Sequence, residues 1–474
     1  MAKQRQGVDI PRAIMKNLTI PIDLLNKYGK SGPRYTSYPP APVWTKEIGE
    51  KEWEGVKIRS SQSTDPISFY IHLPFCAKRC LFCGCNVLIT QKEEVLSEYV
   101  DLLESEFERL APSIEGRKVA QLHLGGGSPS FMPPAMLARM MDFIRKRLQF
   151  EDGAEIAIEV NPEQVDDHLI RVLRANGFNR VSLGVQDLDE TVQKSIGRVC
   201  TFSKIYESVE KIREIDTVKA INLDLIYGLP NQTEKSLDAT LHKILFLRPE
   251  RLAVYPYAHV PWIRPQQRQF ESESLPGPSL KSRLWCDMVK TFSNNEYQLV
   301  GMDHFCLESD ELVQALHNGS LHRNFMGYTT RKGLDLFGIG LTSISSVEEG
   351  YFQNETKLSG YRKAVAAKRS PIEKGYLFQG EDLLRREVIM NTLVRGEIDY
   401  AEIENNFSID FQTHFHTSLE ALKDMESDGL LEFSSGGFKA TPAGMYFLRN
   451  IAMVFDETYQ AVQVEGKPMY SQTV

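Results

Sequence analysis

The chain has 474 residues, more than a single hydrophobic core usually supports, so we expect one large domain with one or two smaller ones. Its 42% hydrophobic and 25% charged residues exclude a disordered or fibrous protein. A net charge of −8 without a dense Lys/Arg stripe argues against a nucleic-acid partner, and no run approaches the roughly 20 apolar residues that span a bilayer. We therefore expect a cytoplasmic protein that binds neither nucleic acid nor membrane.

The first part of the chain contains a Pro-rich aromatic stretch, Pro-Arg-Tyr-Thr-Ser-Tyr-Pro-Pro, at residues 33–40. This stretch is too apolar for a solvated tail, and its prolines interrupt any helix. We predict that residues 1–60 form an N-terminal strap that packs on the main domain.

From about residue 67 to residue 260, short β-rich runs alternate with longer stretches of helical periodicity. The predicted strands are residues 67–72, 119–124, 155–160, 180–185, 220–226 and 251–257. Six βα units predict an α/β fold built on an incomplete parallel (β/α)6 barrel. We place this barrel and its extension within residues 61–375.

A group of cysteines follows the first predicted strand directly. Cys76, Cys80 and Cys83 are spaced by four and three residues, and Cys85 comes two positions later. Seven cysteines is an odd number, and this clustering favours metal or redox chemistry over a disulfide framework. Zinc is a weaker alternative, because it normally takes four ligands and the chain has no second Cys/His pair at a suitable distance.

Three thiolates can hold a [4Fe–4S] cluster with one iron left open for the amino and carboxylate groups of S-adenosylmethionine. One electron from such a cluster would cleave the sulfonium and give a 5′-deoxyadenosyl radical. Cys85 is a less suitable ligand, because a single residue separates it from Cys83. Buried structural cysteines would explain the spacing poorly. We predict that Cys76, Cys80 and Cys83 bind the cluster and form the catalytic centre.

Polar and glycine residues recur at the carboxyl ends of the predicted strands, where βα barrels carry their chemistry. Glycines at 125–127 would let the backbone approach a methionine amino group, although a tight turn would need them equally. Glu159 ends the next strand and could pair with a ribose hydroxyl or an ammonium group, or simply be solvated. The other strand ends carry His72, Gln186, Asp224 and His259.

Further candidates extend this series. Gln186 and Asp224 offer an amide and a carboxylate to ribose or amino groups, and Arg198 offers a guanidinium to the methionine carboxylate. A surface salt bridge is the alternative for Arg198. Tyr70, in the first strand, could stack on the nucleoside or fill the barrel interior.

After about residue 380 the pattern becomes helical and ends in a predicted hairpin at residues 429–441. Helices followed by a hairpin resemble a winged helix. This segment has few basic residues, so a structural lid is a better interpretation than a DNA-binding unit. We assign residues 376–474 to a mainly helical, winged-helix-like C-terminal domain.

The cysteine motif, with its additional Gly84-Cys85-Asn86, resembles the oxygen-independent coproporphyrinogen III oxidases (coproporphyrinogen dehydrogenases) of the radical S-adenosylmethionine superfamily. Shorter related enzymes, including haem chaperones, usually lack the Gly-Cys pair and the strap. The similarity covers residues 28–474, and the segments that carry it are 32–39, 184–187, 224–230, 257–259, 301–305, 322–325, 327–330 and 449–453.

This resemblance implies oxidative decarboxylation of two propionates of coproporphyrinogen III to vinyl groups, giving protoporphyrinogen IX in haem biosynthesis. It implies a monomer that takes a porphyrinogen substrate and works with an unidentified electron donor and acceptor. One S-adenosylmethionine would contact Tyr70, Gly126, Glu159, Gln186, Arg198, Asp224, Ala258 and Ile344. A second molecule would lie near Phe82, Gly127 and Ser128.

Because coproporphyrinogen carries four carboxylates, we expect a local basic pocket on this acidic chain. The alternative for each candidate is a surface or structural cation. The candidates are Arg34, Arg264, Arg268 and Arg323, with His304 and His322.

Three positions depart from the family pattern, namely Leu81, Cys200 and Met326. Met326 stands where a glutamine is common, and a thioether cannot replace an amide as a hydrogen-bond donor. A divergent radical S-adenosylmethionine enzyme with another substrate is therefore an alternative. A haem-binding or haem-delivery protein is a second one.

Overall fold

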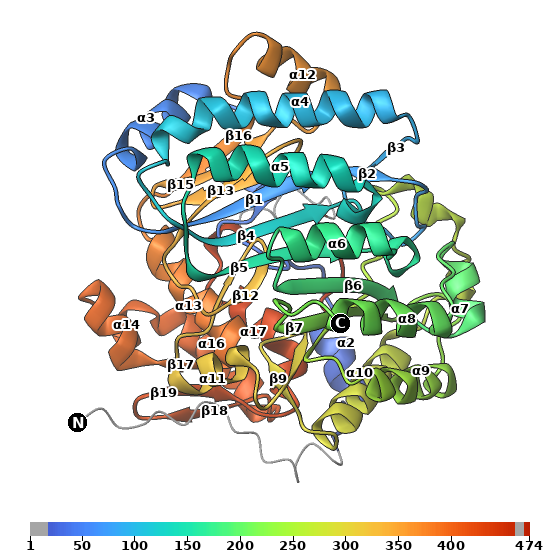
Figure 1. Cartoon of the computed structure of the whole chain (residues 1–474). Helices are drawn as coiled ribbons and strands as arrows, with labels where there is room; N and C mark the ends of the chain where they lie inside the picture. The colour runs from blue at the N-terminus through green and yellow to red at the C-terminus, as the bar shows by residue number, and fades with distance from the viewer. Residues whose placement is uncertain (1–17, 460–468) are drawn as a thin grey trace.

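The computed structural model describes residues 18–459 and 469–474 (Figure 1). Residues 1–17 of the predicted strap lie outside this part. Within the described ranges, none of the helices combines the length and the apolar character needed to cross a membrane.

One large sheet organises the fold, with the strand order β16-β15-β14-β13-β1-β4-β5-β6-β7-β8-β10-β9. Its central strands are all parallel. They are β13 (Asp335–Ile339), β1 (Ile67–Leu73), β4 (Val119–Gly126), β5 (Phe150–Val160), β6 (Arg180–Gln186), β7 (Ala220–Tyr227) and β8 (Arg251–Pro256). The predicted parallel barrel strands are confirmed as β1 and β4 to β8, and β13 adds a parallel neighbour that the prediction missed.

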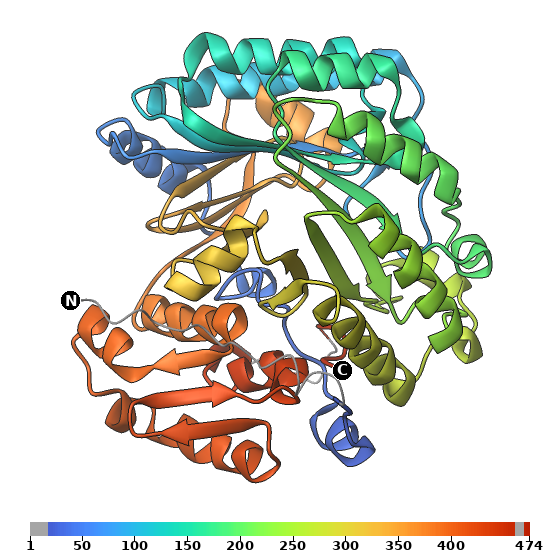
Figure 2. The same cartoon turned by 60° about the horizontal axis from the view of Figure 1, so that its bottom comes forward.

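Helices between these strands cover the outer face of the curved sheet (Figures 1 and 2). In α4, buried Leu96, Val100, Leu103 and Phe107 repeat at three- and four-residue spacing, which is the stripe of an amphipathic helix. Each such burial contributes about 1.5–3 kcal/mol. The covering helices are α4 (Glu93–Leu110), α5 (Pro134–Arg147), α6 (Asp167–Ala175), α7 (Glu190–Ser195), α8 (Phe202–Arg213) and α9 (Glu234–Leu247).

Antiparallel strands extend both edges of the sheet. On one side follow β14 (Ile344–Val347), β15 (Gly350–Asn354) and β16 (Ile372–Leu377), and on the other β10 (His304–Leu307) and β9 (Tyr297–Val300). A separate hairpin pairs β11 (His322–Asn324) with β12 (Gly327–Thr329). The helices of this region are α10 (Pro278–Ser293), α11 (Glu311–Asn318) and α12 (Leu358–Ala366).

The described part of the strap runs between the barrel and the C-terminal elements (Figure 2). It contains α2 (Ile22–Tyr28) and α3 (Glu50–Ser60). Tyr35 and Tyr38 between them are buried, and the Tyr35 hydroxyl donates to an Asp456 carboxylate oxygen at 2.7 Å. The strap is thus part of the core rather than a tail.

The C-terminal part is mainly helical and carries a small antiparallel sheet in the order β17-β19-β18. The predicted hairpin is present as β18 (Leu431–Ser434) and β19 (Gly437–Ala440). The remaining elements are α13 (Asp382–Arg395), β17 (Glu397–Asp399), α14 (Tyr400–Phe407), α15 (Phe411–His414), α16 (His416–Ser427) and α17 (Leu448–Met453).

Candidate active site

The inner face of the barrel is hollow rather than filled. A cavity of about 530 Å³ lies there, within the range of about 300–1,000 Å³ typical of small-molecule sites. Alternate residues of the strands face it, because successive side chains of a strand point to opposite sides. These residues are Glu155, Ala157 and Glu159 of β5, Arg180, Ser182, Gly184 and Gln186 of β6, Ala220, Asn222, Asp224 and Ile226 of β7, and Arg251 and Tyr255 of β8.

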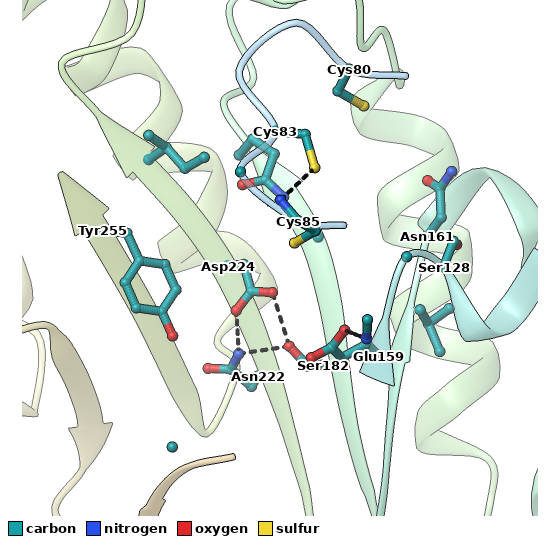
Figure 3. A pocket seen from close by; sticks show the side chains of 18 of the residues that line it. Cys80, Cys83, Cys85, Ser128, Glu159, Asn161, Ser182, Asn222, Asp224 and Tyr255 are labelled. Carbon is teal, nitrogen blue, oxygen red and sulfur yellow. Dashed lines mark hydrogen bonds between the residues drawn. The ribbon is translucent and has the colours of Figure 1, made fainter. Parts of the chain in front are cut away.

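The cysteine loop closes one end of the cavity (Figure 3). It begins in β2 (Phe75–Cys76), which pairs with β3 (Leu88–Ile89). Other segments hold it in place: the Ser128 amide donates to the Phe75 carbonyl at 3.0 Å, and the Gln266 side-chain amide donates to the Cys83 carbonyl at 2.8 Å. The loop is therefore built into the barrel.

The chemistry of this loop fits the predicted cluster. Cys76, Cys80 and Cys83 are partly buried and all line the cavity, and an Arg198 guanidinium nitrogen lies 3.8 Å from the Cys80 sulfur. The thiol and amide of Cys85 hydrogen-bond to the Cys83 sulfur and lower the pKa of the Cys83 thiol below its ordinary value. The Cys85 donors thus favour the thiolate form of Cys83, the form that iron binds, whereas burial raises the pKa of the Cys76 thiol to about 12.

The glycines at 125–127 are required by close packing. A side-chain carbon on Gly126 would lie 2.6 Å from the His72 ring, at a φ of +117°, and one on Gly127 would lie 2.8 Å from the Phe75 carbonyl oxygen. These glycines let β4 approach both the end of β1 and the cysteine loop.

Glu159 is held beside this turn. Its carboxylate accepts a hydrogen bond from the Gly126 amide at 3.0 Å and lies 3.3 Å from Nε2 of His123 (Figure 3). Burial alone would raise the pKa of Glu159, but the interactions with His123 and the Gly126 amide outweigh it and lower that pKa. Glu159 therefore stays ionised, as a partner of a cationic ligand must.

Asp224 faces the same cavity from β7 and has a different environment. Asn222 and Ser182 donate hydrogen bonds to its carboxylate at 2.8 and 3.1 Å (Figure 3). Burial, together with the negative charge of Glu159, raises the pKa of Asp224 to about 6. A cationic ligand would stabilise the ionised form of both carboxylates.

One orphaned polar atom also fits a ligand. Within the described residues, His72 Nε2 and Asn222 Oδ1 are buried without a hydrogen-bond partner, and of these two residues Asn222 lines the cavity while His72 does not. Burial lowers the pKa of His72 to about 4, so its imidazole is neutral. Unpaired buried polar atoms cost free energy, which a bound molecule can recover.

The structure gathers most of the predicted cofactor residues around this cavity. Tyr70 and Ile344 do not line it, and their contacts stay predictions. Tyr70 instead lies 3.0 Å from the ring of His72 through its hydroxyl and stacks on His123. The residues that line the cavity are Phe82, Gly126, Gly127, Ser128, Glu159, Gln186, Arg198, Asp224 and Ala258.

The expected basic residues divide into two groups. Arg34 and His304 line the cavity, and Arg323 donates to the Arg34 and Tyr35 carbonyl oxygens. The cavity lining does not include Arg264, Arg268 or His322. Sequence reasoning missed the lining residues His123, Asn161, Ser182, Asn222, Tyr255 and Tyr328. For Ser182 and Asn222, the alternation of side chains along β6 and β7 was the available signal.

Of the three residues that depart from the family pattern, Met326 lines the cavity, and Leu81 and Cys200 do not. The Leu81 amide donates to the Ile196 carbonyl at 3.0 Å, and Cys200 is bonded through its backbone to the side chain of Gln193. Leu81 and Cys200 therefore support the loops around the site, while Met326 faces the ligand space.

Comparison with known proteins agrees with this site. Residues 70–244 match the Radical SAM superfamily, and residues 378–447 match the HemN C-terminal domain. The oxygen-independent coproporphyrinogen III oxidase of Escherichia coli K12 is 39% identical over 433 residues, which cover 91% of this chain and 94% of that protein. The Helicobacter pylori J99 protein of the same name is 41% identical, and the match covers 92% of this chain and 96% of that protein.

A solved structure gives the same result. The structure of coproporphyrinogen III oxidase (HemN) from Escherichia coli, described as a radical SAM enzyme, superposes with a TM-score of 0.87 at 36% identity and covers 93% of this chain and 99% of its own. The similarity thus includes the strap, the barrel and the C-terminal elements. The chain belongs to the family of oxygen-independent coproporphyrinogen III oxidases within the radical S-adenosylmethionine superfamily.

Proposed function

We propose that this enzyme oxidatively decarboxylates two propionate side chains of coproporphyrinogen III to vinyl groups, giving protoporphyrinogen IX without oxygen. The observation that carries this proposal is the extent of the similarity: relatives named for this activity match more than 90% of the chain, at 39% and 41% identity. A shared barrel alone would support only the reaction class.

The enzyme uses a [4Fe–4S] cluster and S-adenosylmethionine, which together supply a radical able to remove hydrogen from an unactivated carbon such as the propionate β-carbon. Cys76, Cys80 and Cys83 would hold the cluster. Glu159 and Asp224 would face the cationic S-adenosylmethionine, and the barrel wall would keep water from the radical. The protein's own contribution is positioning and shielding.

The proposed contacts of the cofactor follow the cavity lining. Gly126, Glu159, Gln186, Arg198, Asp224 and Ala258, with Tyr70 and Ile344, would contact one S-adenosylmethionine. Phe82, Gly127 and Ser128 would lie near a second molecule.

Three further features belong to the proposal. We place the domain limits at residues 1–60, 61–375 and 376–474. We expect a cytoplasmic monomer that binds no nucleic acid. A separate electron donor must reduce the cluster, and an acceptor must take the electron that remains after decarboxylation.

The test is product analysis of the anaerobically reconstituted protein with S-adenosylmethionine, a reductant and coproporphyrinogen III. We expect a divinyl product together with 5′-deoxyadenosine. Cys80→Ala is the control, because it removes a cluster ligand and should abolish both products. Formation of 5′-deoxyadenosine without vinyl product would favour a different substrate, which Met326 in the cavity wall makes the relevant alternative. Tight haem binding without 5′-deoxyadenosine would favour a delivery protein.

A further inference from the structure

Most of the cations around the cavity have a partner or lie at the cysteine loop. Arg180 and Arg251, on β6 and β8, pair with Glu155, Glu311 and Asp310. Lys78 and Arg79 belong to the cysteine loop, and Arg198 lies 3.8 Å from the Cys80 sulfur. The strap contributes Arg34. A cationic cofactor suits the carboxylates Glu159 and Asp224, so Arg34 is available to another ligand.

Arg34 enters the cavity without a carboxylate partner. Its only hydrogen bond as a donor among the described residues runs from Nη2 to the Pro256 carbonyl at 2.7 Å, and no described Asp or Glu lies within ion-pair distance. Burial lowers the pKa of Arg34, although the charge of Asp303 opposes that effect. The guanidinium remains a cation that its surroundings only partly neutralise.

Two other arginines fix the backbone on both sides of Arg34. Arg449 donates to the carbonyl oxygens of Gly32 and Pro33, the latter at 3.0 Å. Arg323 donates to the carbonyl oxygens of Arg34 and Tyr35, the latter at 3.0 Å. The carbonyl groups of four consecutive strap residues accept hydrogen bonds from these two guanidinium groups. The strap is therefore held rigidly, and Arg34 has a fixed position in the cavity.

This arrangement leaves positive charge without matching negative charge. Asp303 is the carboxylate that faces the group, 4.0 Å from Arg323 and 2.8 Å from Nδ1 of His304. Lys281 has a pKa that is lowered by burial and by Arg34, and its side-chain ammonium makes no hydrogen bond or ion pair within the described parts of the chain. Asp456 is already bonded to the hydroxyls of Tyr35 and Thr458.

Four buried or partly buried cations therefore act on one another, while Asp303 is the carboxylate whose charge acts on Arg34 and Arg323. They are Arg34, Lys281, Arg323 and Arg449. Burial of unmatched charge is costly, and the cost falls when an anion binds. The cavity also offers the Tyr255 and Tyr328 phenols beside His304, with the Tyr255 and Tyr328 rings 6.0 and 4.8 Å from its ring.

We propose that Arg34 is a carboxylate anchor, which binds a propionate of the tetracarboxylate substrate at the strap side of the cavity. The identity of this ligand follows from the proposed function. It would hold a propionate that is not reacting and so orient the macrocycle, with another propionate directed toward the cysteine loop. Arg323 and Arg449 act as positioning residues, because they bond to the strap and not to the ligand.

The experiment compares binding of coproporphyrin III, a stable tetracarboxylate analogue, by the wild-type protein, Arg34→Gln and Arg34→Lys in a fluorescence titration. We expect Arg34→Gln to weaken binding about ten- to a hundredfold, because a charged hydrogen bond is lost from a buried site. Arg34→Lys should retain part of the affinity, since it keeps the charge but not the fork of donors. Arg268→Gln is the matched control and should bind as the wild type does.

Affinity for S-adenosylmethionine separates an anchor from a folding effect. We expect it to be unchanged in Arg34→Gln, whose carboxylate-lined cofactor site is intact. If Arg34→Gln also loses its affinity for S-adenosylmethionine, the Arg34→Lys variant decides between the two explanations. A coproporphyrin III affinity of Arg34→Lys equal to that of the wild type would then overturn the anchor. An Arg34→Gln affinity within about twofold of wild type overturns it as well.

Failure of the anchor and failure of the function are distinguishable. A wild-type protein that forms vinyl product while Arg34→Gln binds coproporphyrin III normally refutes the anchor alone. A wild-type protein that neither binds coproporphyrin III nor forms vinyl product refutes both.

Discussion

Glu159 and Asp224 are two carboxylates in one cavity, and their surroundings shift their pKa values in opposite directions. The His123 ring and the Gly126 amide stabilise the charge on Glu159 and lower its pKa. Asp224 receives only neutral donors and also faces the charge of Glu159, so its pKa rises to about 6. Near neutral pH both are ionised, but only Asp224 is close to gaining a proton.

We predict that S-adenosylmethionine binding weakens as the pH falls through about 6. Below that value Asp224 is neutral and no longer attracts the cationic sulfonium, whereas above it the charge is present. The dissociation constant, measured calorimetrically on the reconstituted protein between about pH 7.5 and about pH 5.5, should rise several-fold.

Two variants make this pH dependence specific. Asp224→Asn should bind more weakly at every pH and lose the dependence, because the titrating group is gone. Glu159→Gln should also bind more weakly and keep a pH dependence, but with its midpoint moved to lower pH, because the charge of Glu159 helps to raise the pKa of Asp224. A pH dependence that survives in Asp224→Asn would assign the titration to another group.

At the scale of residues, the sequence predicted side chains at strand ends better than those within strands. Glu159, Gln186 and Asp224 were recognised because each lies at or near the carboxyl end of a β-rich run. Asn222 and Ser182 were missed because a polar residue inside a strand usually predicts a side chain that faces solvent. Here both side chains face the open interior of the barrel and so belong to the site.

At the scale of elements, α4 connects two parts of the site. The Tyr99 hydroxyl donates to the His72 carbonyl at 2.9 Å and accepts from the Leu341 amide at 2.8 Å. About two turns further along, Glu106 accepts from the Gly340 amide at 2.9 Å and from Asn354 at 2.6 Å. The end of β1, which leads into the cysteine loop, is thereby joined to the turn between β13 and β14.

We predict that Tyr99→Phe lowers the free energy of unfolding by about 1–3 kcal/mol, because it leaves a buried amide and a buried carbonyl without their partner. Denaturant unfolding of the variant and the wild type measures the difference. Tyr206→Phe, which removes the hydroxyl of an exposed tyrosine, is the control and should be neutral. Equal stability of Tyr99→Phe and wild type would show that water replaces the hydroxyl.

The predicted central strands agree with the structure to within two residues at each end, except β5, which begins at Phe150 rather than at residue 155. They were recognised because each is a short β-rich run. The missed strand, β13, pairs in parallel with β1 although it comes after all six predicted strands. Its place in the sheet is decided by which edge is free in three dimensions, and local periodicity carries no information about that choice.

At the scale of the whole molecule, the strap is held by residues from the far end of the chain. Arg449 bonds to the Gly32 carbonyl across a separation of 417 residues. Residues 469–474 also contact the strap: the Thr473 amide donates to the Lys30 carbonyl at 2.8 Å, and the Gly32 amide donates to the Ser471 carbonyl at 3.0 Å. Composition could predict a packed strap, but partners so distant in sequence emerge only from the fold.

Because the strap carries Arg34, we predict that deleting residues 469–474 weakens coproporphyrin III binding, by about tenfold or less, and leaves S-adenosylmethionine binding unchanged. The deletion removes two backbone hydrogen bonds that hold the strap and the Gln472 carbonyl that accepts from Arg449 at 3.1 Å. The double variant Ser471→Ala and Gln472→Ala is the matched control, since these contacts use backbone atoms and should survive it. A fluorescence titration measures coproporphyrin III binding, and a calorimetric titration measures S-adenosylmethionine binding. Loss of both affinities would mean that the C-terminal residues stabilise the whole barrel, and retention of both would mean that Arg323 and Arg449 hold the strap without them.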